Sequence, residues 1–165
     1  YSNEILCQII RPATVCGFSE RMRLDVSVNM LTMQALKNKN ITVFGGNQIR
    51  PNIHIDDITD VYIHLLKIKN KAEGVYNAGF ENLKILEISK MISKEFPCEI
   101  NITKTSDNRS YKVNSEKLIK TGFKPKKNVE KAIKEMAYLI KEKKIKDNLD
   151  CYNLKWMQKN KLHDF

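Results

Sequence analysis

The sequence is poor in several features whose absence limits what this protein can do. Its 165 residues include four cysteines, three histidines, six glycines and one tryptophan. No two cysteines form a CxxC pair and the histidines do not cluster with them, so we expect no metal site. No apolar run reaches the length of a membrane span. Cysteines without a disulfide pattern are typical of a reduced compartment, and we expect a cytoplasmic protein without a membrane partner.

Arginine is also scarce, although the formal net charge is +10. Only five of the 29 basic residues are arginine, which is the usual reader of base edges. The lysines are mixed with acids, as around Glu135, and no aromatic residues alternate with them as stacking platforms. We therefore interpret the charge as solvated lysine-rich faces and expect no nucleic-acid partner. A positive surface would still attract a small anionic substrate.

The common local motifs of catalysis and nucleotide binding are missing. The chain has no GxGxxG, P-loop, HExxH or GxSxG sequence. Asp56 or Asp57 is expected to cap a helix, and Asp60 with His64 to form an exposed pair on that helix. Arg50 follows a glycine turn and could form paired hydrogen bonds to a phosphate. On its own, a surface salt bridge is the simpler interpretation of Arg50.

What the sequence does contain is an alternation of short strands and helices, which predicts a mixed α/β fold. Apolar or alternating runs predict strands at 6–10, 41–44, 53–55, 74–79 and 99–103, the first of them buried. Helical spacing of apolar residues predicts helices at 25–37, 58–68, 86–96 and 128–140. Asn128 is expected to cap the last of these, and Ser115 a short helix that ends at Gly122. We divide the chain into residues 1–146 and a weakly patterned tail, 147–165, whose Trp156, Met157 and Leu162 could dock on the body or on a partner.

Four segments carry a further pattern in a fixed order. They are Ile10-Arg-Pro-Ala-Thr-Val-Cys-Gly17, the stretch 21–57 with Ile41-Thr-Val-Phe-Gly-Gly-Asn-Gln-Ile-Arg-Pro-Asn-Ile-His-Ile-Asp-Asp57, then Gly74-Val-Tyr-Asn-Ala-Gly79, and Asp107-Asn-Arg-Ser-Tyr-Lys-Val113 followed by Pro125. Each segment is a weak signal alone. Together they resemble the C-terminal part of the NAD-dependent epimerase/dehydratase family, the extended short-chain dehydrogenases.

The resemblance implies a fold and a function. Residues 1–146 would form late strands of a Rossmann-like doubly wound sheet and the small α/β substrate-binding domain. The dinucleotide-binding half, and the catalytic tyrosine and lysine, would lie upstream of this chain. The whole protein would use NAD or NADP as an isomerase, lyase or oxidoreductase of a nucleoside-diphosphate sugar in carbohydrate biosynthesis. A homodimer, or association with the N-terminal half, is a further expectation.

The resemblance also implies roles for individual residues. Cofactor contacts beside the nicotinamide would come from Pro12, Ala13, Thr14 and Val15. Arg50 would grip the substrate diphosphate, and Asn29 would lie near the phosphates or the base. The base would be bordered by Val43 and Phe44, and the ribose or phosphates contacted by Asp107 and Arg109. His54 matches a family position at which packing is the expected role.

The chain departs from the family pattern in ways that bear on activity. It has neither a glycine-rich dinucleotide turn nor any Tyr-x-x-x-Lys pair, so no catalytic residue is assigned and this chain alone is expected to be inactive. Cys16 stands where the family usually has tyrosine, and either a buried small residue or a reactive thiol fits there. The alternative to a substrate-binding portion is a truncated, non-catalytic module that binds a nucleotide or a partner.

Overall fold

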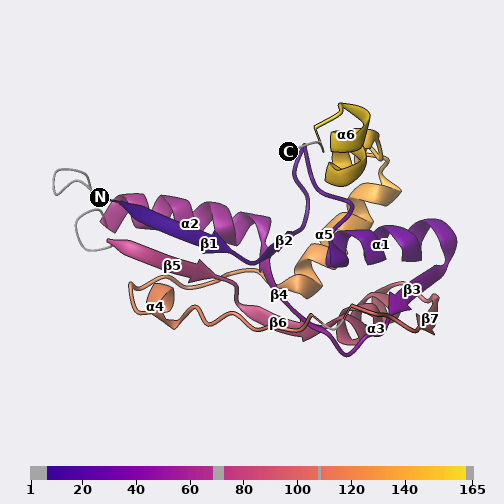
Figure 1. The fold of residues 1–165 in the computed structure, drawn as a ribbon, viewed down its shortest axis with the longest axis horizontal. Coiled ribbons are helices and arrows are strands. Elements are labelled where there is room, and N and C mark those ends of the chain that lie inside the picture. The colour runs from indigo at the N-terminus through magenta and orange to yellow at the C-terminus, as the bar shows by residue number, and fades with distance from the viewer. Residues whose placement is uncertain (1–6, 69–72, 108, 163–165) are drawn as a thin grey trace.

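Three small sheets run through the molecule, with helices packed against them (Figure 1). The computed structural model describes residues 7–68, 73–107 and 109–162. Within that part of the chain the strands are β1 (Gln8–Pro12), β2 (Thr14–Cys16), β3 (Asn40–Phe44), β4 (Ile49–His54), β5 (Gly74–Ala78), β6 (Glu81–Lys84) and β7 (Glu99–Thr103). The helices are α1 (Ser27–Asn38), α2 (Ile55–Ile68), α3 (Ile85–Glu95), α4 (Glu116–Ile119), α5 (Val129–Lys141) and α6 (Asn153–Lys159), with a 3-10 turn, η2 (Leu149–Cys151).

Strand pairing joins segments that are far apart in the sequence. β1 lies parallel to β5, with Gln8 opposite Gly74. β3 lies parallel to β7, with Asn40 opposite Glu99. In the central sheet β4 pairs with β2 in parallel and with β6 in antiparallel orientation. Parallel neighbours need long crossover connections, and helices supply these here.

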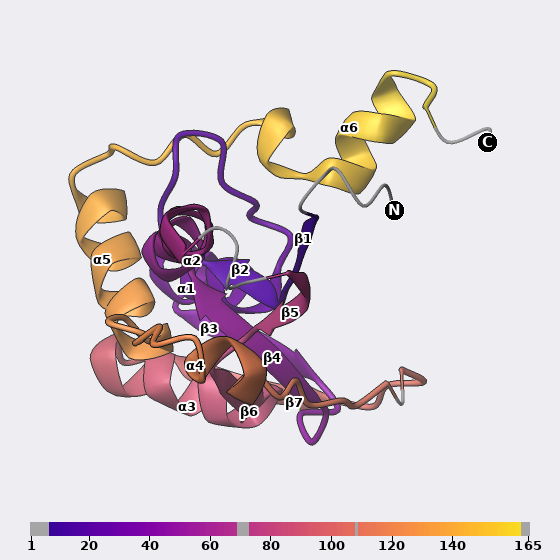
Figure 2. The ribbon, with the colours of Figure 1, turned by 90° about the vertical axis from the view of Figure 1, so that its left-hand side faces the viewer.

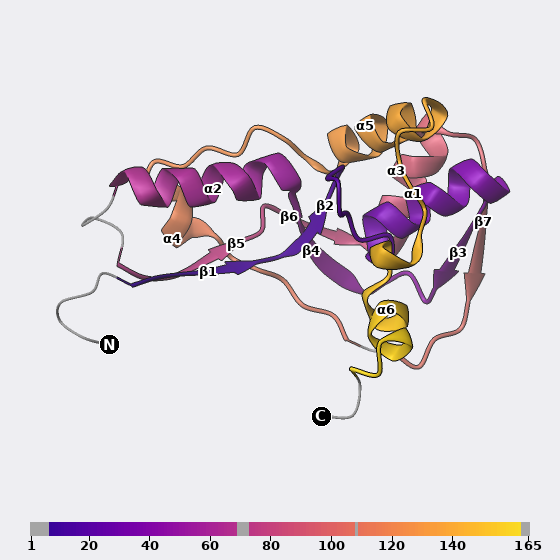
Figure 3. The ribbon, with the colours of Figure 1, turned by 90° about the horizontal axis from the view of Figure 1, so that it is seen from above.

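The central sheet separates two regions, which are most easily followed in Figure 3. The three-helix region consists of α1, α3 and α5 with the β3–β7 pair. Its core holds fully buried side chains from every one of these helices, including Val28, Ile88 and Ile133. The strand-pair region consists of α2 and α4 with the β1–β5 pair. Its smaller core includes Val61, Leu65, Tyr76 and Leu118.

Helix α2 buries one face against the strands and leaves apolar residues on the other. Val61 and Leu65 are buried, whereas Tyr62, Ile63 and Leu66 keep 50%, 44% and 68% of their surface exposed. β1 is only half-buried, although parallel strands are usually covered on both faces. In the described part of the chain, neither α2 nor any other helix has the length and apolar character that crossing a membrane requires.

The predicted strands and helices are largely confirmed, with some shifted ends. The first strand begins at Gln8 and is half-buried rather than buried; Leu6, in the prediction, lies outside the described residues. Ile55 was expected in a strand but is the first residue of α2, because β4 ends at His54. β6 was not predicted, since Leu83 is its one apolar residue.

One predicted helix cap and one predicted pair are wrong, and a second cap is confirmed in its position but not in its bond. Neither Asp56 nor Asp57 caps α2, because the helix begins before them at Ile55 and the buried carboxylate of Asp57 accepts hydrogen bonds from the backbone N–H groups of residues 126 and 127. Ser115 occupies the N-cap position of α4, which ends at Ile119 rather than at Gly122, but its hydroxyl makes no capping bond and instead bonds Gly79. Asp60 and His64 do not pair, since Asp60 contacts Lys126 and His64 contacts a threonine hydroxyl. The Asn128 cap is confirmed: its side chain accepts the backbone N–H of residue 131.

Candidate functional site

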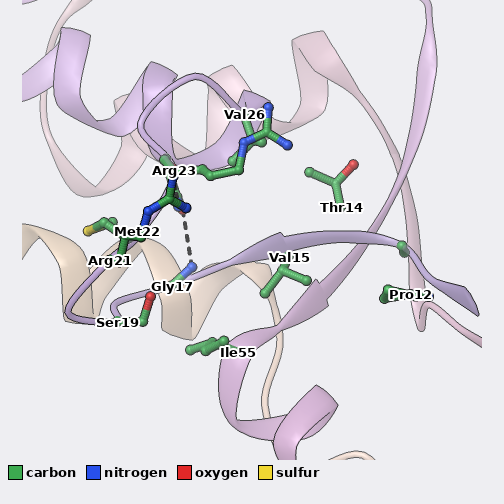
Figure 4. A pocket seen from close by; sticks show the side chains of 12 residues that line it. Pro12, Thr14, Val15, Gly17, Ser19, Arg21, Met22, Arg23, Val26 and Ile55 are labelled. Carbon is green, nitrogen blue, oxygen red and sulfur yellow. Dashed lines mark hydrogen bonds between the residues drawn. The ribbon is translucent and has the colours of Figure 1, made fainter. Parts of the chain in front are cut away.

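A pocket of about 480 Å³ lies between β2, the loop that follows it and the start of α1 (Figure 4). We call it the β2 pocket. One wall is the strand segment with Thr14 and Val15, and the opposite wall carries Arg21 and Arg23 from the loop. The lining residues are Pro12, Ala13, Thr14, Val15, Gly17, Ser19, Arg21, Met22, Arg23, Val26, Asn29 and Ile55.

The turn into the loop requires glycine. Gly17 has a φ of +99°, in the left-handed region that side chains rarely adopt. A Cβ at this position would lie 3.1 Å from His54 Nε2. The backbone therefore turns sharply at the end of β2 and carries the loop away over the pocket.

Asn29 in α1 holds the two ends of the loop together. Its Oδ1 accepts the N–H of Gly17 at 3.1 Å, and its Nδ2 donates to the carbonyl of Arg23 at 2.8 Å. The residue is 2% exposed. Asn29 lines the pocket, as a ligand-binding role would require, but these two bonds show that it also braces the wall. Its contact with phosphates or base stays a prediction.

The two arginines on the loop differ in how far their charge is balanced. Arg23 Nε lies 2.8 Å from Asp25 Oδ1. Partial burial alone would raise the pKa of Asp25, but the hydrogen bond and charge of Arg23, with the N–H of Asn153, outweigh it and lower that pKa. Arg21 contacts the neutral Asn153 side chain at 3.3 Å. Among the described residues it has no carboxylate partner, so the loop wall carries positive charge.

The four residues predicted to meet the cofactor all line the β2 pocket. The N–H of Ala13 is already bonded to the carbonyl of Ala78 at 2.7 Å. β2 is an edge strand of the central sheet, paired only with β4 in the described part of the chain. Its second edge therefore leaves backbone donors and acceptors beside the pocket, which fits a flat amide such as that of nicotinamide.

Arg50, Asp107 and Arg109 come together as a second group, outside the β2 pocket. Asp107 accepts two bonds from the Arg109 guanidinium, both at 2.8 Å, and one from Arg50 Nη2 at 3.3 Å. The hydrogen bonds from Arg109 hold the pKa of Asp107 well below its usual range. Arg50 Nη1 also donates to the carbonyls of Ile49 and Arg109. The structure brings these three residues together, but the bonds of Arg50 go to protein groups, and the contacts of all three with a substrate stay predictions.

Val43 and Phe44 face different environments. Val43 is fully buried in the core of the three-helix region, whereas Phe44 is 57% exposed at the end of β3. A small hollow of about 260 Å³ near Phe44 is lined by Gly45, Asn47, Gln48, Thr105, Asp107 and Ser110. Only Phe44 of the pair presents a surface to a ligand in this structure. Their role beside a base stays a prediction.

Cys16 and His54 are buried behind the pocket. Burial raises the pKa of the Cys16 thiol to about 12, so the group stays protonated at neutral pH, and this supports a packing role over a reactive thiol. His54 uses both ring nitrogens, because Nδ1 accepts the N–H of Asp56 and Nε2 lies 3.0 Å from Glu135 Oε2. Lys127 contacts the carboxylates of both Asp56 and Glu135, so its ammonium group offsets one of the two negative charges beside His54.

The sequence reasoning missed Arg21 and Arg23 as pocket residues. They were included in the stretch 21–57 that resembles the family, but no role was assigned to them. Two of the chain's five arginines lie within three residues, in the segment that follows Gly17, and this is a signal that could have identified them. Asn153, which bonds Arg21 across the fold, has no such local signal.

A family model matches the part of the chain that forms the pocket. Residues 2–79 match the model of the NAD dependent epimerase/dehydratase family. That stretch contains β1, β2, α1, β4 and α2, together with the loop of residues 18–25, which we call the arginine loop. It therefore includes every residue that lines the β2 pocket. The predicted resemblance is confirmed.

Solved structures of similar fold are sugar-nucleotide enzymes. ADP-L-glycero-D-manno-heptose-6-epimerase of Helicobacter pylori is 22% identical, with a TM-score of 0.74 over 85% of this chain and 46% of its own. UDP-glucuronic acid 4-epimerase of Bacillus cereus, in complex with UDP-glucuronic acid and NAD, is 26% identical, with a TM-score of 0.70 over 84% and 46%. RMD of Pseudomonas aeruginosa, complexed with NADPH, is 18% identical, with a TM-score of 0.68 over 82% and 48%. The predicted fold class is confirmed, and the chain spans about half the length of these proteins.

Proposed function

From the match of residues 2–79 to the NAD dependent epimerase/dehydratase family, we propose that this chain is the substrate-binding portion of an NAD(P)-dependent enzyme acting on nucleoside-diphosphate sugars. The single observation that carries the proposal is the β2 pocket. It places the four residues expected beside the nicotinamide opposite a wall with two arginines. A pocket of this size between a polar strand edge and cations suits an anionic small molecule.

In this proposal the chain's own residues bind and orient rather than react. NAD or NADP, when bound, would supply the acceptor for a hydride from a sugar carbon. Backbone groups on the open edge of β2 would hold the nicotinamide amide, and Val15 with Ile55 would give the pocket an apolar wall. Arg21 would attract the negatively charged substrate. No tyrosine of this chain has the lysine four residues later that would make it the expected base.

Arg50 is proposed to bind the substrate diphosphate. Its side chain keeps 18% of its surface exposed, and the planar guanidinium can form paired bonds to phosphate oxygens. Replacement by alanine, Arg50→Ala, is expected to weaken the binding of UDP-glucuronic acid, measured by calorimetry, by roughly tenfold or more, since a bond to a charged group contributes about 1.5–3 kcal/mol. Arg11→Ala, at an exposed strand position, is the matched control. Unchanged affinity in the Arg50 variant would show that the assignment is wrong.

A second candidate is a non-catalytic module that binds a nucleotide or a partner. The observation in its favour is that this sequence contains neither the Tyr-x-x-x-Lys pair nor the glycine-rich turn. The two candidates differ in one measurement. NAD reduction is measured in the chain alone and in a mixture with a dinucleotide-binding half from a relative. Binding of UDP-glucuronic acid without NAD reduction in either case would favour the module. NADH formation in the mixture would favour the substrate-binding portion.

Finer features of the proposal follow the family. The reaction outcome would be epimerisation, dehydration or reduction of an oxidised sugar, in carbohydrate biosynthesis. The exposed apolar face of α2, with Tyr62, Ile63 and Leu66, is the surface we propose for contact with a dinucleotide-binding half or a second copy. The four cysteines are free thiols, which is consistent with a reduced compartment, and the cytoplasm is the proposed location.

A further inference from the structure

The C-terminal tail lies against the loop that carries the two pocket arginines. Figure 2 shows the chain after α5 passing beside the loop that follows β2, and Figure 1 shows the same neighbours from another side. Residues 148–153 make the contacts. From the sequence this tail was expected only to dock on the body or on a partner, and it lies outside the residues that match the family model.

Three hydrogen bonds join the tail to consecutive parts of the loop. The N–H of Leu24 donates to the carbonyl of Cys151 at 2.8 Å. The N–H of Asn153 donates to Asp25 Oδ2 at 3.0 Å. Arg21 Nη2 donates to Asn153 Oδ1 at 3.3 Å. One tail residue, Asn153, therefore contacts both the unpaired arginine and the carboxylate that balances Arg23.

An apolar cluster supports these bonds from beneath. Met22 and Leu24 of the loop pack with Cys151 of the tail, and all three are at most 4% exposed. Met33 of α1 and Met136 of α5 complete the cluster. Met22 and Leu24 therefore pack toward the tail, although Met22 also lines the β2 pocket together with Arg21 and Arg23 (Figure 4).

A salt bridge anchors the tail itself to the body. Lys37, near the end of α1, pairs with Asp147, which also accepts the hydroxyl of Tyr152 at 2.8 Å. The tail is therefore fixed before it reaches the loop. Loop and tail stabilise each other, because either segment without the other would leave one side of the apolar cluster exposed to water.

We propose that residues 148–153 act as a strap that holds the loop of residues 18–25 in position, so that Arg21 and Arg23 face the β2 pocket. Asn153 is the positioning residue of this strap. It acts on a ligand through the arginines and makes no contact with the ligand itself. The inference rests on the proposed function for its consequence on binding, while the ordering of the loop can be measured without any ligand.

Asn153→Pro is the sharpest variant. Asn153 is the first residue of α6, where proline is tolerated, and Tyr152 before it already has the extended backbone that precedes proline. The change removes the N–H that bonds Asp25 and the side-chain oxygen that bonds Arg21, but leaves the helix and the Leu24 bond intact. Leu154→Ala is the matched control, because Leu154 is the next residue and is 64% exposed.

Two readouts test the strap in the 165-residue chain. Amide hydrogen exchange without ligand is expected to accelerate about tenfold at Leu24 and its neighbours in Asn153→Pro, with β3 amides unchanged, since a bond to a charged group is lost. Affinity for UDP-glucuronic acid is expected to fall about threefold or more, because fewer molecules hold the arginines in place. The control should change neither.

Each outcome decides the inference. Unchanged exchange at residues 18–26 would overturn the strap. Faster exchange with unchanged affinity would overturn its link to the pocket. Acceleration across the whole chain would mean that the Asn153→Pro variant is unfolding. Amide exchange and affinity would then be measured in Asn153→Ala, which removes only the bond to Arg21, and the same two outcomes would decide. If the unaltered chain binds no sugar nucleotide, the proposed function fails, whereas the exchange comparison still decides whether the tail orders the loop.

Discussion

The three-helix region and the strand-pair region are built from similar elements but bury them differently. In the three-helix region, α1, α3 and α5 each contribute fully buried side chains to a common core. In the strand-pair region, one long helix covers one face of two strands, and its far side exposes Tyr62 and Leu66. The first region has the coverage of a complete small domain, and the second has the surface of an interface.

The β2 pocket and the group formed by Arg50, Asp107 and Arg109 lie at different places relative to these two regions. The β2 pocket lies where the two regions meet, with β2 and Ile55 on one side and α1 with its loop on the other. The Arg50 group lies at the opposite end of β4, beside the segment that follows β7. Rigid packing therefore supports the arginine loop and Arg50 from the three-helix side, whereas the predicted cofactor residues follow the half-buried strand β1.

The largest expected effect is a loss of stability on shortening a buried side chain in the three-helix region, compared with an exposed side chain in the strand-pair region. Ile133→Ala in α5 removes a side chain that is 1% exposed, and is expected to lower the free energy of unfolding by about 2–5 kcal/mol. Ile63→Ala, at a 44% exposed position of α2, is expected to change it by about 0.5 kcal/mol or less. Urea denaturation measures both. Equal losses would mean that the face of α2 is covered in solution, as in a self-associated chain.

A smaller effect is expected at the junction of β5 and α4 in the strand-pair region. The Ser115 hydroxyl donates to the carbonyl of Gly79 and accepts its N–H, at 2.8 and 2.9 Å. Ser115→Ala leaves both buried groups without partners and is expected to cost about 1–3 kcal/mol. Ser93→Ala in α3, which loses one bond to a carbonyl, is the control from the other region. A loss no larger than that of the control, in thermal or urea unfolding, would contradict this bonding.

The smallest effect concerns pH at the joint between β6 and α5. Glu81 accepts the N–H of Val129 at 2.6 Å, yet burial raises the pKa of Glu81 above its usual value of 4.5. The folded state therefore holds this proton more tightly than the unfolded state. Its contribution to stability is present at pH values below 4.5 and is lost as the pH rises through the folded pKa.

Glu81→Gln tests that sign, because the amide keeps an acceptor for Val129 but cannot ionise. The variant is expected to be slightly more stable than the unaltered chain at pH 7, and the difference should vanish below about pH 4. Unfolding free energies measured across this range decide the matter. A variant that is less stable at pH 7 would show that the ionised carboxylate is favoured at the N-terminus of α5.

Features with local causes could be predicted from the sequence, and features with distant causes could not. Asn128 was recognised as a cap because its partner is three residues away. Ser115 has the same capping chemistry, but its partner Gly79 follows β5 and is 36 residues away in the sequence. β6 has too little apolar character to be noticed and exists because β4 pairs with it.

The candidate site follows the same rule. Family resemblance assigned Pro12–Val15 to the nicotinamide and Asn29 to the phosphates or the base, and all of these residues line one pocket. Arg50 was expected to be available to a ligand, yet its guanidinium bonds Asp107 and two carbonyls, none of which its own neighbourhood could reveal. Trp156, Met157 and Leu162 of the tail were expected to dock on the body or on a partner. On the body, the buried tail residue is Cys151, whereas Met157 and Leu162 are 40% and 38% exposed, so docking on a partner stays a prediction.

The long-range strand pairing has a consequence for synthesis on the ribosome. β1 cannot pair until β5 has been synthesised, and β3 cannot pair until β7 has been synthesised, since Gln8 pairs with Gly74 and Asn40 with Glu99. At about 5–20 residues per second, each early strand spends on the order of seconds without its partner. The strand-pair region cannot close before α4 has emerged, and the three-helix region cannot close before α5 has emerged. The nascent chain therefore carries apolar strand edges through most of translation, and a chaperone that shields them would raise the yield of folded protein.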